Sequence, residues 1–338
     1  MDLNIIWFLL YGVLITGYAI LDGFDLGVGV IHLFTKGEKD KRVNLNAIGP
    51  VWDGNEVWLL TAGGALFAAF PIVYATVFSA FYLALMLLLL FLILRAVSME
   101  FRGKIDSPKW KSVWDWSFGL GSFVPALLFG VAVGNILRGI PLNSEGMFTG
   151  NFFGLLNPYS LLVGVLSLVM FTMHGAVYLT LKTDGGRREQ MKNLITKLWI
   201  ALIIIYFLAT LYTFFEAGYL FQDVLGNPLF WIFFILLLGS LLYLPVAVKG
   251  ENFGKAFIAS STTISGMIGL AAVSLFPRLA PSLTNLDFSL TIYNASSTPR
   301  TLMTMLIIAL IGMPIVLIYT IFIYRTFKGK VEITEDSY

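Results

Sequence analysis

The stretch from Leu83 to Leu94 reads LALMLLLLFLIL, with neither a charge nor a turn residue to interrupt it. A helix needs about 20 mostly apolar residues to cross the hydrocarbon core of a bilayer, and long apolar runs recur throughout this chain. Charged residues make up 12% of the 338 residues, too few to solvate the surface of a soluble protein this size. The sequence therefore predicts an all-α polytopic membrane protein. A β-barrel is excluded because the runs are continuously apolar instead of alternating.

Apolar runs bounded by charged residues, Gly and Pro predict nine transmembrane helices. These spans cover residues 3–32, 48–70, 73–101, 114–138, 157–182, 192–222, 227–248, 256–277 and 300–325. The second span is the weakest, because its first third is the polar stretch GPVWDGNEVW.

Lysine and arginine predict the orientation of the chain. The connections after odd-numbered spans contain Lys36, Lys39, Lys41, Arg42, Arg102, Lys104, Lys109, Lys111, Lys182, Arg187, Arg188, Lys192, Lys249, Lys255, Arg325, Lys328 and Lys330. The alternate connections carry only Arg138, Arg278 and Arg300. Basic residues favour the cytoplasmic side, so we expect the N-terminus outside and the C-terminus in the cytoplasm. The alternation holds only if the second span exists.

We expect one integral membrane domain over residues 1–338. Within it, residues 1–138 are predicted to form a first four-helix bundle, residues 157–277 a second, and residues 300–326 a peripheral final helix. The longest connections, 139–156 and 278–299, both fall on the predicted outer face.

The chain has no cysteine and only two histidines, His32 and His174. Thiolate-ligated haem, iron–sulfur clusters and cysteine zinc sites are therefore excluded, and no metal site is expected. The net charge of +2 gives no indication of nucleic-acid binding.

Seven ionisable residues from four spans are predicted to lie in one layer near the cytoplasmic face. They are Asp22, Asp25, Asp53, Glu56, Arg95, Glu100 and His174. A charge inside a span costs roughly 2.5 to 3.5 kcal/mol on insertion scales, so each one needs a partner or a function. The layer could be a proton entry route, or a polar seam that locks the helices together.

Other polar and aromatic positions have simpler interpretations. His32 is expected to be solvated or to face lipid headgroups, and His174 to be a hydrogen-bonded core histidine. Trp52 is expected in the aromatic belt at the membrane interfaces, together with Trp7, Trp110, Trp114 and Trp116. The Gly23-x-x-x-Gly27 and Gly130-x-x-x-Gly134 spacings permit close helix contact.

Several motifs together resemble subunit II of cytochrome bd quinol oxidase. They are LDGFDLGVG at 21–29, GPVWDGNEVWLL at 49–60, GGALFAAFP at 63–71, EFR at 100–102, WDW at 114–116, GSFVPALLFGVAVGN at 121–135 and MHGAVYL at 173–179. The resemblance covers the whole chain, nine helices included.

The resemblance implies a non-catalytic scaffold paired with a larger subunit I in a bacterial cytoplasmic membrane. That partner would hold two b-type haems, one d-type haem and the quinol site, and the complex would oxidise quinol and reduce dioxygen to water. No haem is expected on this chain, and a small single-helix third subunit is left open. Which quinone is used, and whether a quinone or lipid is bound structurally, are also left open.

The resemblance further implies a proton route. The family's proposed proton-pathway acid in the WDGNE motif corresponds to Asp53, and the one in the GFDLG motif corresponds to Asp25. The proposed pathway residues are Asp25, Asp53, Glu56, Glu100 and Asp22, with Thr61 or Ser98 as hydroxyls, and Trp52, Asn55, Trp58, Arg95 and His174 in support. A proton-coupled transporter and a purely structural membrane subunit are the alternatives.

Overall fold

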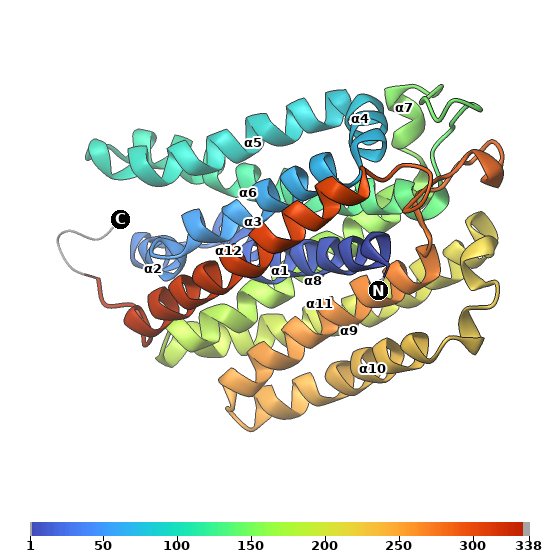
Figure 1. Cartoon of the computed structure of the whole chain (residues 1–338). Coiled ribbons are helices and arrows are strands. Elements are labelled where there is room, and N and C mark those ends of the chain that lie inside the picture. The colour runs from blue at the N-terminus through green and yellow to red at the C-terminus, as the bar shows by residue number, and fades with distance from the viewer. Residues whose placement is uncertain (1, 334–338) are drawn as a thin grey trace.

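The computed structural model describes residues 2–333 and is almost entirely helical (Figure 1). The helices are α1 (Leu3–Leu33), α2 (Glu38–Ile48), α3 (Trp52–Ala69), α4 (Pro71–Ala80), α5 (Tyr82–Phe101), α6 (Pro108–Arg138), α7 (Phe152–Leu155), α8 (Pro158–Lys182), α9 (Gly185–Glu216), α10 (Pro228–Lys249), α11 (Phe253–Leu275) and α12 (Pro299–Thr326). Single 3-10 turns cover Arg102–Lys104, Gly218–Phe221, Val224–Gly226 and Leu286–Phe288. Two short strands, β1 (Arg278–Ala280) and β2 (Leu290–Thr291), pair antiparallel. The predicted all-α class is confirmed.

Within residues 2–333, eight helices are long and apolar enough to cross a membrane: α1, α5, α6, α8, α9, α10, α11 and α12. The second predicted span corresponds to α3, an 18-residue helix whose first turn carries Asp53. In Figure 1 successive long helices run back and forth, and α3 runs alongside α1. Helix α1 begins at one end of the molecule and α12 ends at the other. The count of nine transmembrane helices stays a prediction.

The third span was predicted to be continuous over residues 73–101, and this is wrong. The structure breaks it at Phe81, so that α4 turns away from α5 (Figure 1). The hydroxyl of Thr76 donates to the carbonyl of Gly146 over 3.0 Å, and Val73 is buried in a cluster with Leu142. These contacts with a distant connection hold α4 aside, and an apolar run alone does not reveal them.

Helices α1, α6 and α8 pack closely because glycines line their contacts. A Cβ at Gly27 of α1 would lie 1.9 Å from the carbonyl oxygen of Phe171 and 3.0 Å from Cα of Gly175, both on α8. A Cβ at Gly130 of α6 would lie 2.7 Å from Cα of Gly164, also on α8. Only residues without a side chain allow backbones to approach this closely. The predicted close contacts at the two glycine pairs are therefore confirmed.

The helices predicted to form two bundles make extensive contacts within each group. Helix α1 packs on α3 and α6, and α5 on α6, while α8 packs on α9 and α11, and α10 on α11. The groups are joined tightly, because α8 also packs on both α1 and α6. Helix α12 contacts α1 and α3. The division into two bundles and a final helix stays a prediction.

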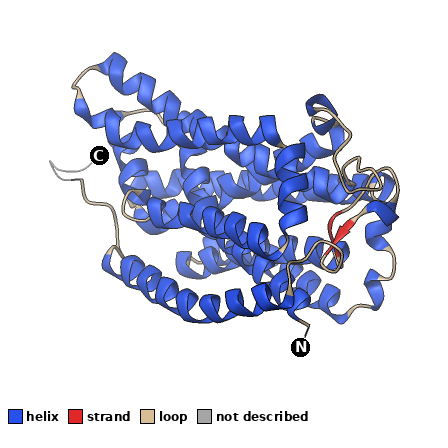
Figure 2. Cartoon of the chain, turned by 45° about the horizontal axis from the view of Figure 1, so that its top comes forward, coloured by secondary structure: helices blue, strands red, loops and turns tan. Residues whose placement is uncertain are grey.

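The two long connections meet at one end of the helices, here called the β end (Figure 2). The amide of Ile140 donates to the carbonyl of Pro281 over 3.0 Å. The amide of Leu283 donates to the carbonyl of Ile140 over 2.9 Å. Helix α2 lies at the opposite end, here called the α2 end (Figure 1). The side of the membrane that each end faces stays a prediction.

Candidate functional site

Arg95 of α5 joins three helices through two carboxylates. Its guanidinium donates to both oxygens of Asp22 on α1, over 2.5 and 3.3 Å, and to Oε1 of Glu56 on α3 over 2.9 Å. Arg95 is 1% exposed and Asp22 is fully buried, whereas the Glu56 side chain is 27% exposed. Two carboxylates around one guanidinium leave a formal charge of −1. This group of residues is called the Arg95 cluster below.

Asp25 lies one turn beyond Asp22 and makes a separate set of contacts. The amide nitrogen of Asn55 donates to Oδ2 of Asp25 over 2.7 Å and to the carbonyl of Leu21 over 3.3 Å. The hydroxyl of Tyr324 on α12 donates to the amide oxygen of Asn55 over 3.0 Å. Asp25 is fully buried, and its Oδ1 contacts no hydrogen-bond donor among residues 2–333. A buried carboxylate oxygen without a donor is costly unless it takes up a proton.

The helical period explains which polar residues of α3 face inward. Trp52, Asn55 and Trp58 are buried and lie three residues apart, on one face of the helix. Asp53 falls on the opposite face and is exposed, as is Glu100 near the end of α5. The structure thus brings Asp22, Glu56 and Arg95 together, and Asp25 with Asn55, but leaves Asp53 and Glu100 on the surface.

His174 of α8 has both ring nitrogens occupied. Nδ1 lies 2.7 Å from the hydroxyl of Ser260 and Nε2 lies 3.0 Å from the carbonyl oxygen of Ile20. The ring stacks on Phe257 with centroids 4.8 Å apart. The interpretation of His174 as a hydrogen-bonded core histidine is confirmed.

Two tryptophans do not lie in an aromatic belt. Trp52 is 7% exposed within the core, and Trp7 is 3% exposed with its indole donating to the carbonyl of Leu302 over 2.9 Å. The prediction for both was wrong, because α12 covers Trp7 and the inward face of α3 carries Trp52. Trp116 is 58% exposed, and its place in the belt stays a prediction. The hydroxyl of Thr61, a suggested relay group, is exposed and bonded to its own helix.

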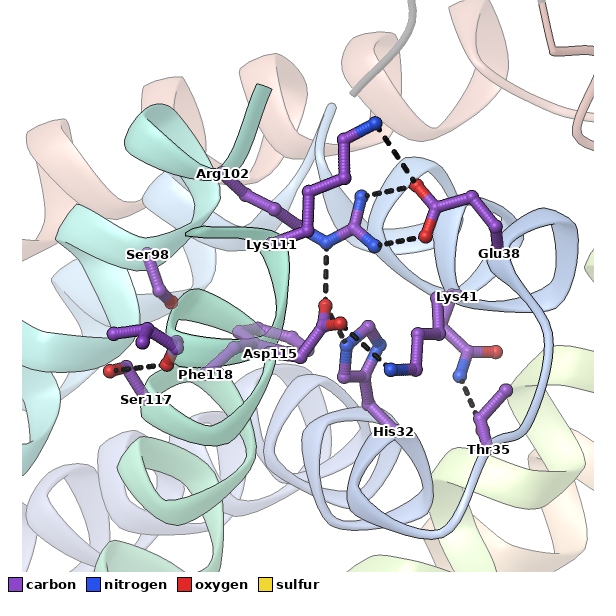
Figure 3. Close-up of polar contacts among 12 residues, drawn as sticks. His32, Thr35, Glu38, Lys41, Ser98, Arg102, Lys111, Asp115, Ser117 and Phe118 are labelled. Carbon is purple, nitrogen blue, oxygen red and sulfur yellow. Dashed lines mark hydrogen bonds and ion pairs between the residues drawn. The ribbon is translucent and has the colours of Figure 1, made fainter. Parts of the chain in front are cut away.

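A second charged cluster centres on Asp115 of α6 (Figure 3). Its Oδ1 accepts from Nε of Arg102 over 2.5 Å and lies 2.8 Å from Nε2 of His32, and its Oδ2 accepts from Nζ of Lys41 over 2.8 Å. Arg102 also forms two parallel bonds to the carboxylate of Glu38, over 2.8 and 3.0 Å. These residues form the Asp115 cluster, which ties α2 to the ends of α1, α5 and α6. Paired bonds of this kind add geometric specificity as well as energy.

The prediction that His32 is solvated or faces lipid headgroups was wrong. His32 is 1% exposed, because α6 covers it with Asp115 and with Phe118, whose ring centroid lies 5.1 Å from the imidazole. The Asp115 cluster joins two distant segments of the sequence, 32–41 and 102–115, so spacing could not reveal the pairing between them. The available signal was an acid in WDW at the start of a span, close in sequence to the arginine of EFR.

Glu38 shows the electrostatic effect of the Asp115 cluster outside the membrane spans. The paired hydrogen bonds from Arg102 favour its charged form and hold its pKa below the ordinary value of 4.5. Lys111 adds to this with Nζ 3.9 Å from the same carboxylate, and it also pairs with Asp106 at 2.7 Å. The α2 end is therefore held by an ordered network of charges.

Among residues 2–333, no three His, Cys, Asp or Glu side chains gather in a way that could hold a metal ion. The two histidines are engaged in contacts with other residues: both nitrogens of His174 are hydrogen-bonded, and Nε2 of His32 is bound to Asp115. These histidines stabilise contacts between helices.

Together the fold and the two clusters define a polytopic α-helical membrane protein with charged groups buried between its spans. The family model for cytochrome bd terminal oxidase subunit II matches residues 3–327. The chain belongs to this family, which confirms the resemblance read from its motifs.

Curated relatives match over nearly their whole length. A probable cytochrome oxidase subunit 2 of Haemophilus influenzae is 40% identical over 98% of this chain and 95% of the relative. The cytochrome bd-I ubiquinol oxidase subunit 2 of Escherichia coli is 37% identical over 97% of this chain and 95% of the relative. The cytochrome bd ubiquinol oxidase subunit 2 of Bacillus subtilis is 34% identical over 98% of this chain and 97% of the relative.

A solved structure shares the fold. A chain of the bd oxidase from Geobacillus thermodenitrificans superposes with a TM-score of 0.81, over 97% of this chain and 99% of that chain, at 17% sequence identity. A likeness at this identity shows that the helical arrangement is retained while most side chains differ. The protein is accordingly a multi-pass membrane protein.

Proposed function

We propose that the chain is a membrane scaffold for a haem-bearing subunit I and provides part of the proton uptake route of a bd-type quinol oxidase. The family match and the full-length relatives, two of them named as ubiquinol oxidase subunits, support the assignment to this complex. Two b-type haems, one d-type haem and the quinol site would belong to the partner subunit. Those haems would supply the oxygen chemistry there, and this chain would bind and move protons.

The proposed orientation places the α2 end in the cytoplasm. The basic residues of the Asp115 cluster lie at this end, and cytoplasmic connections are rich in Lys and Arg. The Asp115 cluster would then stiffen the face at which protons enter. The β end, with its two interlocked connections, would face outward.

One observation carries the proton route: Asp25 is fully buried and keeps one carboxylate oxygen free of donors among residues 2–333. Acids of decreasing exposure support a path toward it, from exposed Asp53 and Glu100 through partly exposed Glu56. Ionisable groups inside spans mark proton relays when they line a pathway. Asp22 would tune the route through Arg95, because their ion pair fixes a charge beside the relay.

Proton uptake from the cytoplasm makes the reaction electrogenic. Protons consumed at oxygen would come from inside, and those released by quinol would leave outside. Each charge moved across the membrane potential is worth about 2.3 kcal/mol per 100 mV. No pumping step is needed.

The test compares Asp25→Asn and Asp53→Asn with the unmodified complex in liposomes. Visible spectra first establish that the haems are retained. We expect Asp25→Asn to reduce oxygen consumption and proton uptake by about 100-fold, in the range for removal of a proton-transfer group. Asp53→Asn should have a smaller effect, because an exposed acid at an entrance can be replaced by water.

A purely structural role is the second candidate, favoured by the bonding of Arg95 to both Asp22 and Glu56. The same experiment separates the two roles. Normal proton uptake in both variants would leave the chain with a scaffold role alone.

A further inference from the structure

The final helix, α12, contributes a polar group to the buried acids. Within residues 299–326 that helix is mostly apolar and exposed, yet its last turns carry Tyr324, which packs against the core. The hydroxyl of Tyr324 donates to Oδ1 of Asn55 over 3.0 Å. The contact joins residues 269 positions apart in sequence, so only the tertiary structure reveals it.

This hydrogen bond and the two acceptors on the other side of Asn55 together fix which end of its amide faces Asp25. An amide has one accepting oxygen and one donating nitrogen. Tyr324 donates to the oxygen, and the nitrogen donates to Oδ2 of Asp25 at 2.7 Å and to the carbonyl of Leu21 at 3.3 Å. Rotating the amide by half a turn would place its oxygen against a carboxylate oxygen, and the two would repel each other.

We propose that Tyr324 is a positioning residue of the proton route. It acts through Asn55, whose fixed amide occupies Oδ2 of Asp25 and thereby keeps Oδ1 as the oxygen that takes up and releases the proton. The step balances simply: one O–H bond forms at Oδ1 when a proton arrives and breaks when it leaves, and no electron moves. The inference rests on the proposed proton route through Asp25.

Contacts on either side of Tyr324 hold it in place. The ring of Tyr324 lies edge-on to Phe24 of α1, with centroids 6.5 Å apart. One turn further, Nζ of Lys182 donates to the carbonyl of Phe327 over 2.7 Å. The amide of Val331 donates to the backbone carbonyl of Lys182 over 3.0 Å. The end of α12 is thus tied to the end of α8. The hydroxyl of Tyr324 therefore meets Asn55 at a defined position.

The central test is Tyr324→Phe, which removes the hydroxyl and keeps the ring. The control is Tyr319→Phe on the same helix, where the side chain is 60% exposed. Both are measured in the complete complex in liposomes, with proton uptake normalised to haem content. We expect Tyr324→Phe to slow proton uptake and turnover by about threefold to tenfold, as for loss of one neutral hydrogen bond, with the KM for ubiquinol unchanged. Tyr319→Phe should match the unmodified complex.

Two further readouts separate positioning from packing. The infrared carboxyl band that Asp25→Asn removes should shift in Tyr324→Phe and stay in place in Tyr319→Phe. In an Asn55→Ala background, Tyr324→Phe should slow uptake no further, because the group through which it acts is gone. Both are measured on assembled complex, so a lower yield of the variant does not affect them.

The outcomes distinguish this inference from the proton route itself. Normal uptake and an unshifted band in Tyr324→Phe, with uptake strongly reduced in Asp25→Asn, would overturn the role of Tyr324 and leave the route standing. Equal slowing by Tyr324→Phe with and without Asn55 would also overturn it. Normal uptake in Asp25→Asn would remove the route and the role of Tyr324 together.

Discussion

The guanidinium of Arg95 binds the fully buried carboxylate of Asp22 through both of its terminal nitrogens, at 2.5 and 3.3 Å. The two residues come from α5 and α1, 73 positions apart in the chain. Removing one partner of a buried ion pair leaves an uncompensated charge, which costs far more than the intact pair contributes.

Arg95→Met should therefore destabilise the protein by about 3–5 kcal/mol. The double variant Arg95→Met with Asp22→Leu should recover part of the loss, because the fully buried charge of Asp22 is then gone while the partly exposed Glu56 still lacks Arg95. Thermal unfolding of the purified protein measures both effects. If the double variant were less stable than Arg95→Met, the charge on Asp22 would have a stabilising role that this pairing does not explain.

Asp115→Asn should destabilise the α2 end by about 3–5 kcal/mol, because buried Arg102 and partly exposed Lys41 would lose a shared anion. Asp106→Asn is the matched control: its side chain is 97% exposed and pairs with partly exposed Lys111, so stability should not change. Proteolysis of residues 34–51 should accelerate in the first variant alone. Equal proteolysis of both variants would mean that the Asp115 cluster does not hold α2 in place.

The stabilising effect of Glu38 on the folded protein should depend on pH, with a defined sign. Its pKa is lowered in the folded protein by Arg102, so its stabilising effect is present above the ordinary value of 4.5 and disappears as the pH falls through the lower folded value. Glu38→Gln should therefore be less stable than the unmodified protein at pH 7, and the difference should vanish in strong acid. The check is the difference in unfolding temperature across this range. A difference that stays constant would show that the ionic bond to Arg102 does not contribute.

Gly27→Ala should disrupt the contact of α1 with α8. A methyl group there would meet a backbone carbonyl oxygen at 1.9 Å, which no change of rotamer can relieve, so the helices must separate at a cost of about 3 kcal/mol. Gly12→Ala on the same helix has nothing within 4 Å of the new atom and should be neutral or slightly stabilising. Comparable assembly of the two variants with subunit I would contradict the close packing.

The positions of ionisable residues within the predicted spans anticipated part of the site. Asp22, Glu56 and Arg95 come from three spans and were all placed in one layer. The grouping of Asp22, Glu56 and Arg95 near one depth could therefore be anticipated. The period alone did not show that Asp53 faces outward, because it does not say which face of α3 meets α1.

Composition, apolar runs and the positions of basic residues were enough to determine that the chain is a helical membrane protein, and its motifs identified the family. These properties are local, since twenty apolar residues seek lipid wherever they lie in a fold. Which charges neutralise each other was decided only by the tertiary structure, because Asp115 with His32, and Asn55 with Tyr324, meet across helices far apart in sequence. Helix spacing defines a face, but only packing defines its neighbour.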